Sequence, residues 1–396
     1  MLEIIQSLPS YQELLARLRA NQVPPGLALP RAARLAVLAA LHADLQVPLV
    51  LLTGRADHAL TLLDELGFWS PGALRLLFPE PNPLFYEQAA WGSATRRDRL
   101  HALTVLAAYQ LPGASKPAQP AIIVAPARAI MARTLPRRDF VKASRTIRTG
   151  QAVAPDVLLR AWTDTGYQPA DIVVEQGQFS RRGGILDIWA VAEPLPARLE
   201  FFGDEIDTLR QFDPATQRTV KSLDDLLITP AREFLPGKAQ ELGLSLQGLS
   251  EFDLPRIHPA PASLLDYLPP QALVLVDDLD IFQATVNEVE EQSLRIRQES
   301  IKDGLLAEDF PAPYLDFSEI QDSLDGHPTL ELGRSSAEEP SPLALRHPDE
   351  GLALRHPEAS EPWRGSEASE PCRGSEVSEP CRGSGEGLAA EPETKL

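Results

Sequence analysis

The chain has 396 residues, 43% of them hydrophobic, and a formal net charge of −19 at pH 7. It is therefore long enough for two or three domains, and too acidic to be a general nucleic-acid coat, which relies on clustered Lys and Arg. Both cysteines lie near the C-terminus, so we expect no disulfide and no cysteine-bound metal in the folded part. The sequence also has no apolar run of membrane-spanning length and no signal peptide, which predicts a cytoplasmic protein without a membrane partner.

The first third of the sequence predicts helices that alternate with apolar strands. Helices are expected at residues 2–20, 31–44, 58–65 and 94–109, and strands at 47–52, 74–79 and 121–125. The helical segments carry apolar residues at spacings of three and four, and the strands are short, continuous apolar runs. This alternation predicts an α/β layer with a mostly parallel sheet.

A short turn, residues 53–57, connects the first strand to the next helix, where a nucleotide-binding fold would place its phosphate loop. Such a loop needs several glycines, whose N–H groups surround the phosphates, and then Lys followed by Ser or Thr. Here Gly54 is the only glycine, no Lys-Ser/Thr pair follows, and Asp57 would repel a triphosphate. We interpret the turn as structural, in a degenerate nucleotide fold; the alternative is a functional ATP site.

Another apolar strand, at residues 272–278, ends in two acids, Asp277 and Asp278, and Asp280 follows it. Carboxylates in this position can hold magnesium in nucleotide-hydrolysing folds. Because the matching phosphate loop is missing, we favour a helix cap, in which Asp278 or Asp280 accepts hydrogen bonds from the first N–H groups of the next helix. We expect this strand to return to the first sheet.

Residues 172–220 have the pattern of an antiparallel meander. Apolar and polar residues alternate through Ile172 and Val174 and again over residues 185–189, which is the period of half-buried strands. Turn signals recur at short intervals, for example at residues 182–184. Such short connections predict antiparallel strands, inserted into the α/β domain.

Arginine and aromatic residues are the main functional candidates of the meander. They are Arg181, Arg182, Arg198, Phe202, Arg210 and Arg218. Exposed on a sheet, such residues can bind a protein, because guanidinium groups form several planar hydrogen bonds and tolerate desolvation. Alternatively, the arginines are solvated or pair with Glu200, Asp204 and Asp207. Phe201 and Phe202 cannot both face the core, since successive strand residues point to opposite sides.

The C-terminal part changes character. Residues 343–387 repeat with a period of nine and consist mainly of Pro, Glu, Ser and Gly. This composition offers almost no core, so it cannot offset the entropy lost on ordering, and it predicts a disordered tail over residues 330–396. Trp363, Cys372 and Cys381 occupy equivalent repeat positions, and we assign no metal site to them.

The meander resembles one protein family through a fixed order of residues. The matching phrases are Gly177-x-Phe179-x-x-Arg182-Gly183-Gly184-Ile185-Leu186-Asp187-Ile188, Arg198-Leu199-Glu200-Phe201-Phe202-Gly203-Asp204-Glu205-Ile206-Asp207, Phe212-Asp213-Pro214 and Gln217-Arg218. They are similar to the UvrB-homologous module near the N-terminus of bacterial transcription-repair coupling factors (Mfd), which in UvrB docks UvrA. The resemblance implies that Arg182, Arg198 and Phe202 bind UvrA. It also implies structural roles for Asp187 and for the glycines at 183–184.

The resemblance implies a division of the chain. It consists of an N-terminal helix (1–25), two halves of a UvrB-like α/β domain (26–142 and 230–329), an inserted UvrA-binding module (143–229) and the disordered tail (330–396). The expected fold class is α/β, with a degenerate nucleotide-fold-like, mostly parallel sheet and an inserted antiparallel, β-rich (α+β) module.

The expected function is that of a non-catalytic, UvrA-binding adaptor in transcription-coupled nucleotide excision repair. By this resemblance the chain is truncated before the polymerase-binding and translocase domains, so RNA polymerase and double-stranded DNA would be partners only through those missing domains. We expect no catalytic residue, no cofactor and no metal. Two alternatives stay open: a UvrB-like or helicase-like fragment that binds ATP and DNA, and a non-functional gene remnant.

Overall fold

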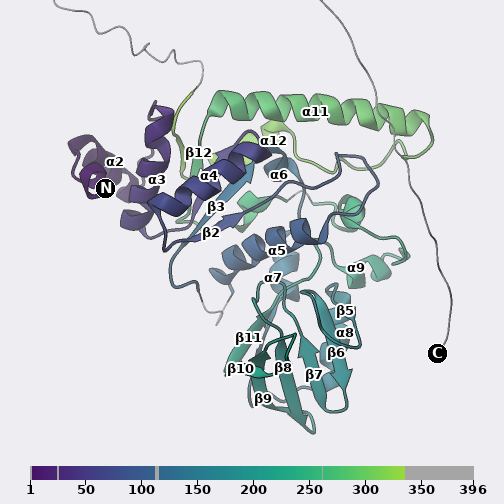
Figure 1. Cartoon of the computed structure of the whole chain (residues 1–396). Helices are drawn as coiled ribbons and strands as arrows, with labels where there is room; N and C mark the ends of the chain where they lie inside the picture. Colours follow the sequence, from purple (N-terminus) through teal and green to yellow (C-terminus); the bar gives the residue numbers. More distant parts are fainter. Residues whose placement is uncertain (1, 25, 112–115, 261, 335–396) are drawn as a thin grey trace, which may run out of the picture. The chain divides into compact units, whose positions relative to one another are not determined.

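The computed structural model describes residues 2–334, apart from residues 25, 112–115 and 261. It is mixed α/β, with a parallel and an antiparallel sheet, as the sequence predicts (Figure 1). The repeats at 343–387, with Trp363, Cys372 and Cys381, lie outside the described residues. Among the helices that are described, none is both long enough and apolar enough to cross a membrane.

A five-stranded parallel sheet forms the centre of the α/β part. Its strands, in pairing order, are β13 (Thr329–Glu331), β12 (Leu273–Val276), β1 (Leu49–Thr53), β3 (Ala121–Pro126) and β2 (Leu74–Leu77). All neighbouring strands run parallel. β12 pairs with β1, so the chain returns to this sheet after the meander, as predicted.

Helices pack on both faces of the parallel sheet (Figure 1). The helices outside the meander region are α1 (Leu2–Gln6), α2 (Pro9–Arg19), α3 (Arg31–Leu45), α4 (Ala56–Trp69), α5 (Ser93–Ala108), α6 (Ala127–Met131), α7 (Arg137–Ala143), α9 (Pro236–Glu241), α10 (Leu254–Ile257), α11 (Leu279–Lys302) and α12 (Phe317–Asp325). Two 3-10 turns lie at Glu251–Asp253 and Leu264–Tyr267. Alternate residues of β1 enter different cores. Val50 and Leu52 belong to the core that contains residues of α5 and α11, whereas Leu49 and Leu51 belong to the core of α3 and α4.

Both ends of the α/β part differ from the prediction. The single helix expected over residues 2–20 is divided into α1 and α2, because Pro9 begins α2 and has no N–H group with which to continue a preceding helix. At the other end, residues 330 and 331 belong to β13 instead of the tail. Leu330 and Leu332 are fully buried, so the hydrophobic core extends past the predicted boundary.

The meander forms a six-stranded sheet. Its strands, in pairing order, are β10 (Thr219–Ser222), β9 (Glu205–Phe212), β8 (Ala197–Phe202), β7 (Ile185–Ile188), β6 (Gln178–Arg182) and β5 (Gln168–Pro169). The strands from β6 to β10 pair antiparallel, as predicted, whereas β5 runs parallel to β6. α8 (Pro155–Asp164) contributes Leu158 and Trp162 to the hydrophobic core, and Trp162 lies 5.7 Å from the ring of Phe179 on β6.

The segment before β6 does not form the strand that the alternation of its sequence predicts. Ile172 and Val174 are 54% and 60% exposed, while Val173 between them is buried, and the segment is not a strand. The backbone N–H groups of Val174 and Glu175 donate to the side-chain oxygen of Gln178, at 3.0 and 3.2 Å. These local side-chain hydrogen bonds replace the bonds that a strand partner would make, which explains why the alternation did not produce a strand.

The two connections between the sheets run side by side. β4 (Arg145–Arg148) and β11 (Asp225–Ile228), neither of which was expected, pair antiparallel as a small separate sheet. Beyond β11, Glu233 receives two hydrogen bonds from Arg99 of α5, at 2.6 and 3.1 Å, and neither side chain is exposed. A buried ion pair therefore joins the end of the meander region to the α/β part.

Candidate protein-binding surface

One face of the antiparallel sheet carries a group of charged side chains of the meander, and we call it the outer face. Asp187, Arg198 and Arg210 lie directly opposite one another on β7, β8 and β9. The adjacent residues Leu186 and Leu199, like Leu209 on β9, are buried on the other side. The alternation of each strand, combined with this register, therefore directs the leucines to the core and the arginines outward.

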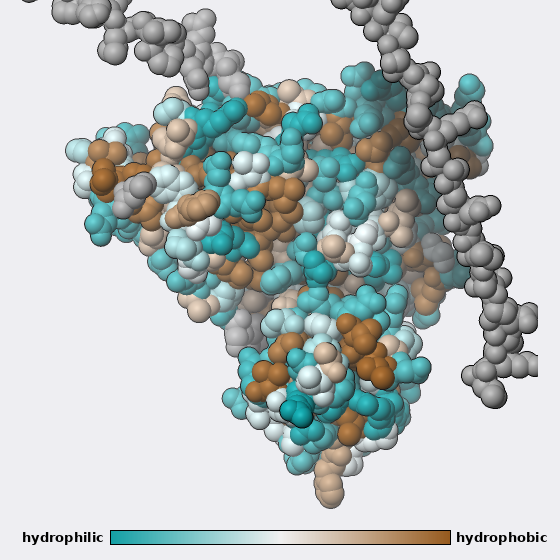
Figure 2. All heavy atoms as spheres, viewed as in Figure 1, coloured by the Kyte–Doolittle hydropathy of each residue, from teal (hydrophilic) through white to brown (hydrophobic). Residues whose placement is uncertain are grey.

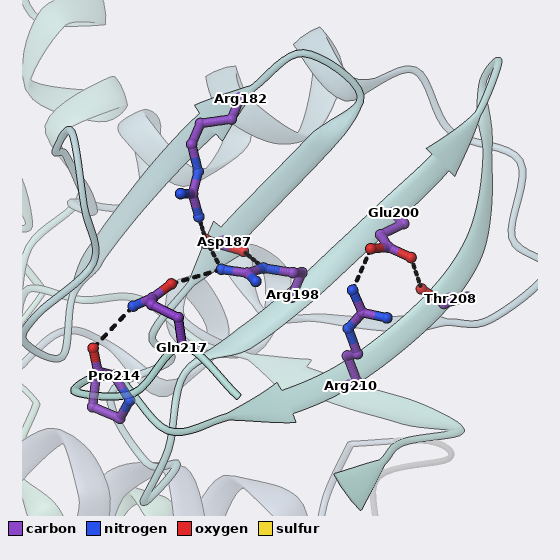
Figure 3. A network of polar contacts seen from close by, with 8 residues as sticks. All are labelled: Arg182, Asp187, Arg198, Glu200, Thr208, Arg210, Pro214 and Gln217. Carbon is purple, nitrogen blue, oxygen red and sulfur yellow. Dashed lines mark hydrogen bonds and ion pairs between the residues drawn. The ribbon is translucent and has the colours of Figure 1, made fainter. Parts of the chain in front are cut away.

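Asp187 organises two arginines of the outer face, Arg182 and Arg198 (Figure 3). Its Oδ1 accepts a hydrogen bond from Arg198 Nε at 2.7 Å, and its Oδ2 accepts from Arg198 Nη2 at 2.8 Å and from Arg182 Nη2 at 2.6 Å. The hydrogen bonds to Asp187 raise the pKa of Arg198. Asp187 is itself 2% exposed, so it serves hydrogen bonding within the module, as its expected structural role requires.

The three predicted binding residues differ in exposure. The side chain of Arg182 is 49% exposed and that of Arg198 is 13% exposed. Phe202 is 83% exposed at the end of β8, whereas Phe201 packs against the core, as the alternation requires. The structure thus joins Arg182 and Arg198 through Asp187. It places Phe202 four residues further along β8, about 13 Å away at the usual rise of a strand.

The other arginine candidates have separate environments. Arg210 pairs with Glu200, which also accepts a hydrogen bond from Thr208 at 2.9 Å (Figure 3). Arg181 points to the opposite face, as its place next to Arg182 in a strand requires, and pairs with Asp156 of α8. Arg218 is exposed. Of the six candidates, only Arg182 and Arg198 therefore share one charged group.

Glycines lie in the turns of the two hairpins that carry this surface. Gly183, between β6 and β7, has φ +60°, and Gly203, between β8 and β9, has φ +63°, a region that favours glycine. The second turn directly follows Phe202 and leaves its ring in solvent. In the view of Figure 2, the part of the molecule that contains this sheet shows separate hydrophobic patches between hydrophilic residues.

The turn where a phosphate loop would lie is filled by a neighbouring helix. A Cβ atom at Gly54 would stand 2.8 Å from both Ile281 Cγ2 and Thr285 Oγ1 of α11. The acids at the end of β12 are also engaged within the chain. Asp278 caps α11 by accepting a hydrogen bond from the N–H of Ile281 at 3.2 Å, which confirms the predicted cap.

Asp277 has partners of its own at this end of β12. It accepts a hydrogen bond from Arg34 Nη1 at 3.2 Å and lies 3.0 Å from His58 Nε2. Burial opposes ionisation, but the hydrogen bond with His58 and the charge of Arg34 together lower the pKa of Asp277. Within residues 2–334, gaps excepted, no group of three or more His, Cys, Asp or Glu side chains is placed to hold a metal ion.

Residues 146–234, which contain the whole antiparallel sheet, match the model of the UvrB interaction domain. This segment is a UvrB interaction domain. It begins within β4 and ends beyond β11, so the paired connecting strands lie at the two ends of the domain. The resemblance seen in the sequence is confirmed.

Similar proteins cover more of the chain than this domain. The transcription-repair-coupling factor of Myxococcus xanthus is 35% identical over 233 residues, which are 57% of this chain and 19% of that protein. That of Bacillus subtilis is 29% identical over 303 residues, 67% of this chain and 25% of that protein. The UvrABC system protein B of Cyanothece sp. is 39% identical over 114 residues, 29% of this chain and 17% of that protein. The matched residues thus span a quarter or less of these relatives.

Sequence reasoning missed two residues of the outer face, Phe212 and Gln217. The ring of Phe212 lies under the guanidinium of Arg198, 4.4 Å from centroid to Cζ, and Gln217 accepts a hydrogen bond from Arg198 Nη2 at 2.8 Å. Both belong to the phrases that carry the resemblance, yet nothing in their spacing indicates that a turn brings them to Arg198. The UvrB interaction domain therefore surrounds Arg198 more completely than the sequence suggested.

Proposed function

We propose that the chain binds UvrA through the outer face of its UvrB interaction domain, as a non-catalytic adaptor in transcription-coupled nucleotide excision repair. A role in nucleotide excision repair is supported by the domain family and by the similarity to transcription-repair-coupling factors and UvrB. The observation that carries the proposal is the exposure of Arg182, which the buried carboxylate of Asp187 holds, and of Phe202 at the end of β8.

The chemistry of the outer face suits a partner that offers hydrogen-bond acceptors and an apolar recess. Arg182 and Arg198 share the single carboxylate of Asp187, so one positive charge is left uncompensated within the group. A carboxylate or carbonyl group of UvrA would meet that charge. Phe202 would enter an apolar pocket, which removes its ring from water.

Preorganisation supports binding by these residues. Arg198 is held by Asp187 and lies on Phe212, so little side-chain freedom is left to lose when a partner binds. An arginine held in this way presents its remaining N–H groups in a fixed direction. Aromatic and arginine side chains in such positions contribute most of the binding energy in many protein interfaces.

The proposal assigns no nucleotide chemistry to the α/β part. The packing of α11 against Gly54 and the pairing of Asp277 with Arg34 support this, because both occupy the place where phosphates and magnesium would bind. We likewise propose no contact between the described residues and RNA polymerase or double-stranded DNA. The proposed process would place the chain in the cytoplasm.

A direct binding experiment tests the proposal. The full chain and an Arg182→Ala, Arg198→Ala, Phe202→Ala triple variant are immobilised and incubated with purified UvrA. We expect the wild type to retain UvrA and the triple variant to lose it. The matched control exchanges Arg181, on the opposite face, and Phe68, which is 88% exposed on α4, for Ala. Equal retention by wild type and the triple variant would rule the surface out.

A further inference from the structure

The turn between β9 and β10 is built around Asp213. The Oδ1 of Asp213 accepts hydrogen bonds from the backbone N–H groups of Ala215 and Thr216, at 2.9 and 2.7 Å, and its backbone oxygen accepts from Gln217 N–H at 2.8 Å. Asp213 N–H donates to the oxygen of Arg218 at 2.9 Å, which closes the turn. Hydrogen bonds of Asp213 and of the backbone thus close this turn, and they do not involve the side chain of Gln217.

Gln217 nevertheless adopts a conformation that glutamine disfavours. Its φ is +60°, in the left-handed region, where glycine is preferred and other residues are strained. Its side-chain Nε2 donates to the backbone oxygen of Pro214 at 2.9 Å, and its Oε1 accepts from Arg198 Nη2 at 2.8 Å (Figure 3). A glycine would form the turn with less strain but would lack both side-chain contacts, so the contacts call for an explanation.

The contacts of Arg198 show what the side chain of Gln217 does. Asp187 accepts hydrogen bonds from Nε and Nη2, and Gln217 accepts a further hydrogen bond from Nη2. Phe212 covers one face of the guanidinium. Nη1 makes no hydrogen bond with the residues that the structure describes. The arrangement therefore leaves one nitrogen of Arg198 available, in an orientation set by three fixed neighbours.

We propose that Gln217 is a positioning residue of the UvrA-binding surface: it fixes the guanidinium plane of Arg198 so that Nη1 is presented to the partner. This inference rests on the proposed function, and it adds one residue of the turn after β9, Gln217, to the surface. Asp187 alone would hold Arg198 by one edge. The hydrogen bond from Nη2 to Gln217 fixes a second direction and keeps the guanidinium flat on Phe212.

A glycine substitution separates this role from a contribution to stability. Glycine at position 217 adopts the left-handed backbone conformation without strain, which offsets the loss of the hydrogen bond to Pro214. We therefore expect Gln217→Gly to have a melting temperature equal to or above that of the wild type. The affinity of the full chain for purified UvrA should fall about tenfold, since a hydrogen bond to a charged group is lost from the preorganised surface. Ala215→Gly, an exposed change in the same turn, is the matched control and should leave the affinity unchanged.

The side chain of Arg198 supplies a readout that does not need UvrA. In the isotope-labelled full chain, the Nη2 protons should give resolved NMR signals, because two acceptors hold them. In Gln217→Gly these signals should merge by rotation of the guanidinium, whereas Ala215→Gly should preserve them. The signals are assigned by their absence from Arg198→Lys.

The two readouts distinguish the possible failures. Unchanged UvrA affinity in Gln217→Gly, or unchanged Arg198 signals, would overturn the positioning role. If the wild type itself does not bind UvrA, the proposed function fails. The NMR comparison then still decides whether Gln217 orients Arg198. Loss of affinity together with merged signals and an undiminished melting temperature would support the inference.

Discussion

The two larger sheets use their charged side chains in opposite ways. At the end of β12, Asp277 pairs with Arg34, and these side chains are 5% and 7% exposed. On the outer face of the antiparallel sheet, Asp187 is equally buried, but its partner Arg182 is 49% exposed. One cluster is closed and satisfied within the chain, and the other leaves cations at the surface.

This difference shows why position in a fold does not by itself indicate a functional site. In open α/β folds, ligands bind beyond the carboxyl ends of the parallel strands. Here that place is filled, because Ile281 and Thr285 of α11 stand where even a methyl group on Gly54 would collide. The available chemistry lies instead on a sheet inserted into the scaffold, where buried Asp187 holds exposed groups in place.

The largest expected effect concerns the buried pair of Arg34 and Asp277 at the end of β12. Arg34→Met removes the cation beside buried Asp277 and should lower the free energy of unfolding by about 3–5 kcal/mol, because this carboxylate would lose the charge of its arginine partner. Urea unfolding measures this loss, and Arg31→Met, exposed on the same helix, is the control. A loss below about 1 kcal/mol would show that the cluster contributes little to stability.

Buried His258, which contacts the partly exposed Asp139 and Lys238, predicts a dependence on pH. Burial, with the nearby charge of Lys238, lowers the pKa of His258 from 6.5 to about 4, although Asp139 opposes the shift. Because the folded pKa lies below the unfolded one, His258 should stabilise the fold above pH 6.5, and this stability should be lost as the pH falls towards 4. The loss should approach about 3 kcal/mol. Unfolding curves of the wild type and of His258→Gln between pH 7 and 4 measure it. Parallel curves would contradict the assignment.

A smaller effect is expected at the filled phosphate-loop position. Gly54→Ala adds a methyl group 2.8 Å from Ile281 and Thr285, so α11 must shift, and the free energy of unfolding should fall by about 2 kcal/mol. Gly72→Ala is the control, because its nearest neighbour is the side chain of Gln119 at 3.8 Å. Neither the wild type nor the variant should bind ATP in an equilibrium binding assay. Saturable ATP binding by the wild type would favour the helicase-like alternative.

Much of the fold could be predicted from local patterns. Helix periodicity and continuous apolar runs indicated the parallel sheet and its helices, and short turns indicated the meander. Short elements without a pattern of their own were missed. β4 and β11 contain four residues each and are strands only because they pair with one another across the chain. The alternation at Ile172 and Val174 was misleading, because local hydrogen bonds to Gln178 decide the backbone there.

The candidate surface was predictable in residue type but not in geometry. Arginine and phenylalanine in a meander indicated a binding surface, and alternation alone required Phe201 and Phe202 to separate. Which arginines share a face depends on register between strands, so Arg181 could be separated from Arg198 only with the sheet in hand. The contact of Gln217 with Arg198 needed the left-handed turn, which the sequence does not indicate at a glutamine.

The central claim is that UvrA binds the outer face and not the α/β part. Calorimetric titration of UvrA into two double variants of the full chain tests this claim most directly. Arg182→Ala, Phe202→Ala alters the outer face, whereas Arg55→Ala, Asp57→Ala alters the exposed turn at the end of β1. We predict that the first variant binds UvrA at least about 100-fold more weakly than the wild type, with two exposed anchors removed, and that the second binds as the wild type does. Wild-type affinity in the first variant, or an equal loss in both, would contradict the assignment of UvrA binding to the outer face.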